Sequence, residues 1–323
     1  YAPSSGIAPL VEAIAEKLVR ENDIPVRPAD VIVVNGGMQG LFAAFQSVVN
    51  PGDEVLMFSP YWTPVRDLIA LTRGTPVLVD TAAARLTGLR EALQAKLTER
   101  TRCLYVNTPQ NPSGVVLSRD ELEAIASVAR DHGLVVISDE AYEHLVYDEP
   151  HVSIASLPEM YERTITCYTF SKSYAMTGWR LGYTVAPEPF ITGLKKLVLT
   201  STNGVSTPTQ WAGPAAITER GDFHEWCRAE YRTRRDLMAE GLASLGFRLD
   251  LPAGAFYAFP DATAFGADSW SLSTALLERG QVACLPGAIF GPEGEGRLRF
   301  SFSTSIETIE RGLEALRGAL DHI

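Results

Sequence analysis

The residues of this chain that are best suited to chemistry are a lysine among hydroxyl groups and an arginine that follows it. Residues 166–180 read TCYTFSKSYAMTGWR, with Lys172 near the middle. A lysine partly removed from water loses its proton more easily, and the neutral amine can then condense with an aldehyde to form a Schiff base. Thr169, Ser171 and Arg180 supply donors suited to a phosphate dianion. The segment therefore predicts a nucleophilic Lys172 beside a phosphate site.

From Lys172 the chain reads KSYAMTGWRLGY, and this run resembles the lysine motif of fold-type I aminotransferases, the aspartate aminotransferase superfamily. The resemblance covers nearly the whole chain in ordered blocks, at residues 1–6, 36–39, 59–62, 107–114, 138–142, 252–260, 286–291 and 297–303. It implies an aminotransferase that uses pyridoxal 5'-phosphate, with Lys172 bonded to the cofactor.

Short β-branched runs must carry these residues, and they alternate with amphipathic helical stretches. The runs are residues 31–35, 54–59, 76–80, 103–107, 134–139 and 164–170. Such alternation is typical of an α/β fold with a mainly parallel sheet and crossover helices. Ser118 followed by Glu121 predicts a capped helix that ends at Gly133. Residues 207–245 have the pattern of one long helix.

The resemblance allows a more detailed prediction of the fold. It implies a fold-type I transferase, with a large domain around a mainly parallel seven-stranded sheet and a smaller α+β domain at the C-terminal end. We assign residues 1–235 to the large, cofactor-binding domain and residues 236–323 to the small one. The family carries several tens of residues ahead of the position of Tyr1, including an arm, and we expect that arm to be absent from this sequence.

Composition favours an ordinary cytoplasmic enzyme. The net charge of −11 would repel nucleic acid, and no stretch approaches the roughly eighteen consecutive apolar residues of a membrane span. No leader that targets a membrane is recognisable. The cysteines are far apart, which argues against a disulfide framework or a zinc site. The histidines show no metal spacing, and we interpret them as surface or satisfied residues: His132, His144, His151, His224 and His322.

Ligands of open α/β sheets gather at the carboxyl ends of strands. Residues 35–40 follow the first strand and open a helix, so their amides and the helix dipole can hold a phosphate. The resemblance implies that the backbone amides of Gly37, Met38 and Gln39 do so. It also implies that Trp62, after the next strand, lies flat on the pyridine ring of the cofactor.

Two further strand ends carry polar residues. Asp139 ends an apolar run, and a buried carboxylate is costly without a cationic partner. The resemblance implies that the protonated pyridine nitrogen is that partner. It also implies that Asn111, in a Pro-rich turn, and Tyr142 both donate to the phenolic oxygen of the cofactor.

Arg299 and Tyr1 are predicted to complete the site. The resemblance implies that Arg299 binds the substrate α-carboxylate through a bidentate fork, beside Asn111 and Trp62, whereas Arg297 is structural. Tyr1 matches the tyrosine that donates to the cofactor phosphate of the neighbouring subunit. A homodimer with shared active sites follows, since a two-fold interface uses the same residues on both subunits.

The predicted function is amino-group exchange between an L-amino acid and a 2-oxo acid in two half-reactions, with Lys172, Asp139 and Tyr142 as catalytic residues. Met38 stands where aspartate-specific relatives carry a lysine, which favours a neutral or aromatic amino acid. Alternatives are a lyase, decarboxylase or oxidase on the same scaffold. A different class is the ligand-sensing domain of a transcription regulator. No metal is expected.

Overall fold

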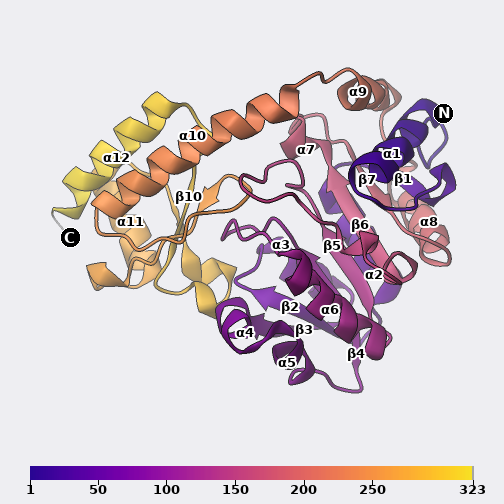
Figure 1. The fold of residues 1–323 in the computed structure, drawn as a ribbon, viewed down its shortest axis with the longest axis horizontal. Helices are drawn as coiled ribbons and strands as arrows, with labels where there is room; N and C mark the ends of the chain where they lie inside the picture. Colours follow the sequence, from indigo (N-terminus) through magenta and orange to yellow (C-terminus); the bar gives the residue numbers. More distant parts are fainter. Residues whose placement is uncertain (322–323) are drawn as a thin grey trace.

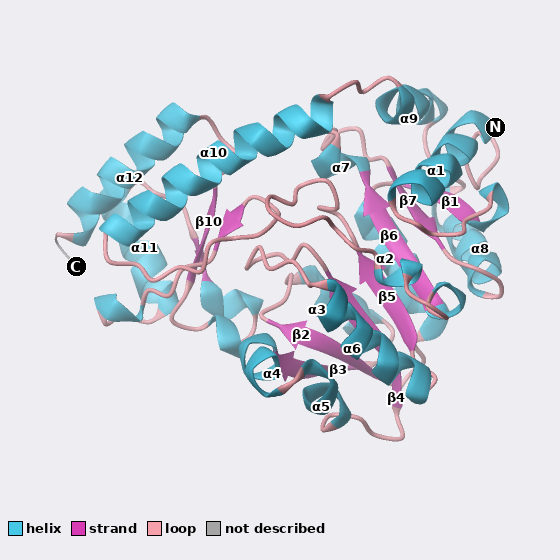
Figure 2. Cartoon of the chain, viewed as in Figure 1, coloured by secondary structure: helices cyan, strands magenta, loops and turns pink. Residues whose placement is uncertain are grey.

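The larger part of the molecule is built around one sheet, as a computed structural model that describes residues 1–321 shows (Figures 1 and 2). Its strands, within the described residues, are β1 (Val31–Val34), β2 (Glu54–Ser59), β3 (Thr75–Asp80), β4 (Thr101–Asn107), β5 (Val135–Asp139), β6 (Thr164–Thr169) and β7 (Gly182–Val185). Their order is β1-β7-β6-β5-β4-β2-β3. Strands β3, β2, β4, β5 and β6 pair in parallel, whereas β7 pairs antiparallel with β6 and β1. The prediction of a mainly parallel seven-stranded sheet is confirmed.

Helices bury both faces of this sheet, so its strands are apolar on both sides. On β2, Val55 and Met57 pack against one face with α2 (Gly37–Val48), α3 (Pro64–Leu71) and α8 (Phe190–Thr202). Leu56 and Phe58 point to the other face, which α4 (Thr81–Thr87), α5 (Leu89–Gln94) and α6 (Arg119–Asp131) cover. At β1 and β7 that face is covered by α1 (Ala8–Glu21) and α9 (Thr207–Thr218).

The strand positions agree with the sequence pattern to within one or two residues. Helix α6 begins as predicted, because Ser118 accepts a hydrogen bond from the Glu121 N–H and Glu121 accepts one from the Ser118 N–H. The single helix predicted over residues 207–245 is wrong. Helix α9 ends at Thr218 and α10 (Phe223–Ser244) begins after a turn in which Gly221 has a left-handed φ of 54°, a conformation that ends helices.

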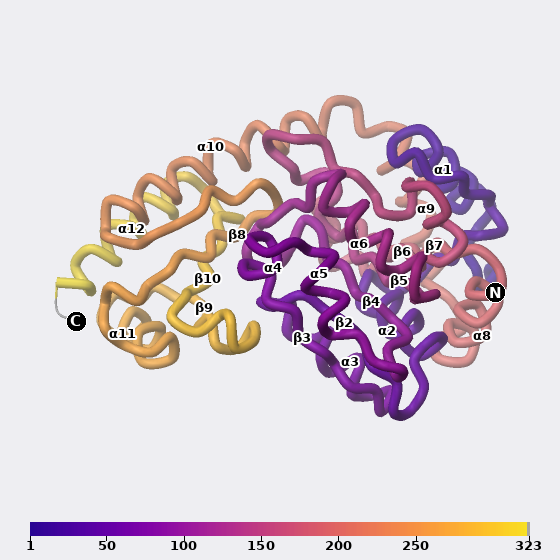
Figure 3. The backbone as a smooth tube through the Cα atoms, turned by 60° about the horizontal axis from the view of Figure 1, so that its bottom comes forward, coloured from indigo at the N-terminus to yellow at the C-terminus, as the bar shows by residue number. Residues whose placement is uncertain are grey.

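The smaller part is formed by C-terminal elements, which group at one end of the molecule, away from the N-terminus (Figure 3). The strands β8 (Tyr257–Ala258), β10 (Leu298–Ser301) and β9 (Leu285–Pro286) form an antiparallel sheet in that order. It packs with α10, α11 (Ser269–Gly280) and α12 (Ile306–Leu320) around buried residues such as Phe300. Helix α10 reaches from the larger part to the smaller one (Figure 1), so the division at residues 235 and 236 falls inside it and stays a prediction.

Three neighbouring strands end together on one edge of the large sheet. Asn107 of β4 lies opposite Asp139 of β5, and Asp139 lies opposite Cys167 of β6, two residues before the end of that strand at Thr169. The loops that leave these strands therefore start side by side. Within residues 1–321, no helix combines the length and the apolar character needed to cross a membrane.

Candidate active site

A cavity of about 250 Å³ opens at the carboxyl ends of β4, β5 and β6. This is where ligands of open α/β sheets bind. The predicted site residues that line it are Gly37, Met38, Trp62, Asn111, Asp139, Tyr142, Thr169, Ser171, Lys172 and Arg180. Thr169, Ser171, Lys172 and Arg180 belong to one local segment, and the parallel strands bring the others to it from distant parts of the sequence.

Lys172 lies at this cavity on α7 (Phe170–Ser173), a single helical turn directly after β6. The hydroxyl of Thr169 accepts a hydrogen bond from the Ser171 N–H at 3.1 Å and so caps this turn. Burial lowers the pKa of Lys172, and the nearby charges of Arg299 and Arg180 lower it further. Both effects favour the neutral amine that a nucleophile requires.

Asp139 lines the cavity and is buried, with 6% of its surface exposed. Its Oδ2 accepts a hydrogen bond from the Tyr105 hydroxyl at 2.8 Å, and its Oδ1 accepts one from the Ala141 N–H at 3.3 Å. Burial raises the pKa of Asp139 to about 6, although these donors oppose the shift. Its partners among the described residues are thus neutral, and the carboxylate would gain from a cationic ligand.

Donors for an anion lie at the N-terminus of α2. Gly36 turns the chain with a φ of 76°, and a side chain at this position would overlap the guanidinium of Arg180. The first N–H groups of a helix lack partners within the helix, so Gly37 and Met38 present theirs at the cavity. With the hydroxyl groups of Thr169 and Ser171 and with Arg180, they form an anion cradle.

Gln39 is not among the residues that line this cavity, and its assignment to the phosphate stays a prediction. Its backbone N–H donates to the Gly36 carbonyl at 3.2 Å. Its side-chain Oε1 accepts from the Asn35 N–H at 2.7 Å, and its Nε2 donates to Thr202 Oγ1 at 2.9 Å. The side chain therefore bridges to α8, where it supports the turn before α2.

Arg299 reaches the site through two cavity residues. Its Nη1 donates to Asn111 Oδ1 at 2.8 Å, and its guanidinium lies 4.4 Å from the centre of the Tyr257 ring. Arg297 points elsewhere and donates to the Phe259 carbonyl at 3.1 Å. Asn111 and Arg299 thus form one polar pair at the edge of the cavity.

Two tyrosines of the site were missed by sequence reasoning. Tyr105 looks like a core residue, because it stands in the apolar strand β4. Tyr257 belongs to a strand of only two residues, which is too short to show alternation. Its hydroxyl lies 3.1 Å from the Tyr142 hydroxyl. Burial raises the pKa of Tyr142, so its hydroxyl stays protonated and able to donate.

Two predictions concern residues outside the cavity. Tyr1 is fully exposed at the chain end and does not reach the site of its own chain. The interpretation of the histidines is wrong for His224, which is buried with neither ring nitrogen hydrogen-bonded to any described residue. His144 and His151 each bond a glutamate through Nε2, and His132 is exposed. His322 lies outside the described residues.

Known proteins similar to this chain carry the same architecture. The model of the family described as aminotransferase class I and II matches residues 1–316. The aspartate/prephenate aminotransferase of Thermus thermophilus is 40% identical over 318 residues, which are 97% of this chain and 81% of that protein.

Solved structures agree with this match. An aromatic aminotransferase from Pyrococcus horikoshii superimposes with a TM-score of 0.96 at 38% identity, covering 100% of this chain and 88% of the other. The aspartate aminotransferase from Thermus thermophilus with maleate gives a TM-score of 0.94 at 39% identity, covering 99% and 83%. These relatives do not favour the lyase, decarboxylase, oxidase or regulator alternatives. The chain belongs to the family of class I and II aminotransferases.

Proposed function

We propose that this aminotransferase binds pyridoxal 5'-phosphate in the cavity at the ends of β4, β5 and β6 and uses Lys172 as its catalytic amine. The observation that carries the proposal is the set of groups that line this one cavity together. A cradle of amides, hydroxyls and Arg180 suits the phosphate, and the buried Asp139 suits the protonated ring nitrogen. Lys172 also lines the cavity, with a pKa lowered by burial. The donor set therefore fits this cofactor.

When bound, pyridoxal phosphate supplies an aldehyde that takes up the amino group and a ring that withdraws electrons from the substrate α-carbon. Asp139 would pair with the ring nitrogen and keep it protonated. Tyr142 and Asn111 would donate to the phenolic oxygen, and Trp62 would cover the ring. The neutral Nζ of Lys172 accepts the substrate α-proton and returns it later in the cycle.

Arg299 is assigned to the substrate. Its guanidinium can donate two parallel hydrogen bonds to one carboxylate. The hydrogen bond from Arg299 to Asn111 holds the guanidinium at the cavity. The amino-acid donor and the 2-oxo acid acceptor both carry this carboxylate. One arginine can therefore serve both half-reactions.

The identity of Met38 favours a neutral or aromatic amino acid as donor. Met38 lines the cavity with a side chain that is 40% exposed, and it offers no charge to a second substrate carboxylate. The similar proteins include enzymes named for aspartate and for aromatic substrates, so the fold is compatible with either class. The side chain at position 38 is our reason to choose between them.

We further propose a homodimer in which Tyr1 of each subunit donates to the phosphate bound by the other. The exposed position of Tyr1 supports this, because the residue has no role in its own site. A cytoplasmic location is proposed from the cysteines, which are free in the structure, as is usual in a reducing compartment.

A spectral titration tests the proposed function. Purified protein is loaded with pyridoxal phosphate, and its near-ultraviolet and visible absorption is followed while single L-amino acids are added. We expect conversion to the pyridoxamine form, reversed by a 2-oxo acid, with neutral or aromatic amino acids reacting at the lowest concentrations. A spectrum that no amino acid changes would contradict the proposal.

A further inference from the structure

The loop that follows β5 directs its side chains to two places. Asp139 and Tyr142 line the cavity. Glu140 and Glu143 are buried outside it, with 1% and 8% of their surfaces exposed. Buried carboxylates are costly unless they are paired or hydrogen-bonded, so the partners of these two glutamates must account for their positions.

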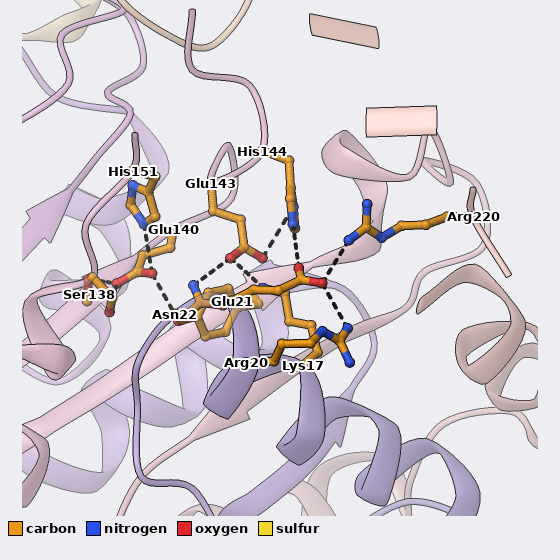
Figure 4. A network of polar contacts seen from close by, with 12 residues as sticks. Lys17, Arg20, Glu21, Asn22, Ser138, Glu140, Glu143, His144, His151 and Arg220 are labelled. Atoms are coloured by element: carbon orange, nitrogen blue, oxygen red, sulfur yellow. Dashed lines mark hydrogen bonds and ion pairs between the residues drawn. The ribbon is translucent and has the colours of Figure 1, made fainter. Parts of the chain in front are cut away.

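Glu143 is held by α1, as Figure 4 shows. Lys17 Nζ lies 2.5 Å from Glu143 Oε2, and Asn22 Nδ2 donates to the same oxygen at 2.8 Å. The side chains of Lys17 and Glu143 are 1% and 7% exposed. Burial alone would raise the pKa of Glu143, but Lys17, His144 and the hydrogen bonds lower it to about 2. The ion pair is therefore charged and shielded from water.

The next residue of the loop is held by the same helix. Glu21, one turn after Lys17 on α1, lies 3.3 Å from His144 Nε2 through its Oε2. Its Oε1 accepts from Arg220, between α9 and α10, at 2.7 Å. Consecutive residues of the loop are thus fixed by residues one turn apart on α1 (Figure 4).

Glu140 is held separately, by the sheet and the loop that precedes β6. It accepts hydrogen bonds from the hydroxyl groups of Ser138, Ser153 and Tyr168 at 2.9, 2.6 and 2.9 Å. Tyr142 lies between these two anchored glutamates. Its hydroxyl lies 3.1 Å from the Tyr257 hydroxyl, and its ring packs edge-on against Phe256 and Tyr257. The position of the hydroxyl depends on these contacts and on what holds the loop behind it.

We propose that the buried pair of Lys17 and Glu143 positions Tyr142 for the reaction. A buried ion pair adds little net stability, because the cost of removing both charges from water offsets their attraction. The pair stands directly behind a residue assigned to the cofactor, and a shift of about 1 Å in such a residue can lower a rate about a hundredfold. Lys17 and Glu143 are positioning residues, and this inference rests on the proposed function.

Glu143→Gln is the direct test, with Glu54→Gln as the matched control. Glu54 is also a buried glutamate in a 2.5 Å ion pair, with Arg100, but it lies at the amino end of β2, away from the cavity. Each variant is loaded with pyridoxal phosphate. The measurements are kcat, KM and the pH midpoint of the absorption band of the cofactor bound at Lys172.

We expect Glu143→Gln to lower kcat by about ten- to hundredfold with little change in KM. The pH midpoint of the band should rise, because a displaced Tyr142 no longer stabilises the deprotonated form of the cofactor bound at Lys172. In a Tyr142→Phe background the same substitution should have a much smaller effect, since both changes act through one hydroxyl. Glu54→Gln should leave kcat and the midpoint close to those of the unaltered enzyme.

The variant with both Lys17→Met and Glu143→Leu separates positioning from stability. It replaces the pair by apolar residues of similar size, which avoids leaving one buried charge unpaired but removes the two side-chain hydrogen bonds of Asn22. A stable double variant with low kcat and a raised midpoint supports the inference. A double variant with normal kcat and midpoint overturns it. The inference is also overturned if Glu143→Gln lowers kcat by the same factor in the Tyr142→Phe background as in the unaltered enzyme. If the unaltered protein shows neither a cofactor band nor amino-group exchange, the proposed function itself is wrong.

Discussion

The Tyr105 hydroxyl on β4 donates a 2.8 Å hydrogen bond to Asp139 Oδ2 at the end of the neighbouring strand β5. This donor orients the carboxylate but leaves its charge uncompensated, and burial raises the pKa of Asp139 to about 6. The carboxylate of the free protein therefore ionises less readily than a carboxylate in water. A bound ring cation would reverse that preference.

Asp139→Asn should consequently stabilise the protein without cofactor and weaken the protein with it. The pKa of Asp139 is raised from 3.8 to about 6 on folding, so the stability it contributes is complete below pH 3.8 and is lost as pH rises through about 6. Above that range, the free energy of unfolding of the cofactor-free variant should exceed that of the unaltered protein by on the order of 3 kcal/mol. The gain should fade on acidification.

Thermal unfolding of both proteins across this pH range, with and without pyridoxal phosphate, checks the prediction. With cofactor, the variant should bind more weakly and turn over more slowly, because the ring nitrogen loses its counter-ion. A variant with normal cofactor affinity and rate would make Asp139 a structural residue.

Lys172→Ala should abolish the absorption band of the lysine-bound cofactor and lower turnover by several orders of magnitude, because the nucleophile and the proton carrier are both lost. Lys196, exposed on α8, provides the matched control. Absorption spectra and single-turnover rates of the two variants distinguish them. If the Lys172 variant kept its activity, the assignment of the catalytic amine would have to be abandoned.

Met38→Lys should raise kcat/KM for aspartate or glutamate relative to neutral substrates. A charge-assisted hydrogen bond to the second carboxylate is worth about 1.5 to 3 kcal/mol. Met38→Leu controls for changes in shape. An unchanged ranking of substrates in both variants would show that Met38 does not face the substrate side chain.

Tyr1→Phe should weaken cofactor binding by about 1.5 to 3 kcal/mol, the value of one hydrogen bond to a charged group, while the dimer persists. Equilibrium binding of pyridoxal phosphate and analytical sedimentation measure the two properties. A monomer that turns over at full rate would refute both the shared site and the dimer.

The sequence was sufficient for those features that depend on neighbours in the chain. Lys172, with Thr169 before it and Arg180 after it, forms one local segment, so a nucleophilic lysine beside a phosphate site could be predicted from it, and the family resemblance extended this prediction to the cofactor. Asp139 could be predicted because a carboxylate at the end of an apolar strand is exceptional. The strands themselves were recognisable, since β-branched runs buried on both faces leave a clear pattern.

Tertiary packing decided the features that depend on distant partners. Lys17 and Glu143 are 126 positions apart, and the contact of Tyr257 with Tyr142 joins the small sheet to the loop after β5. The side chain of Gln39 donates to Thr202 on α8, 163 positions away in the sequence. No local pattern records such contacts, because burial and hydrogen bonding select partners only when helices and sheets have taken their places.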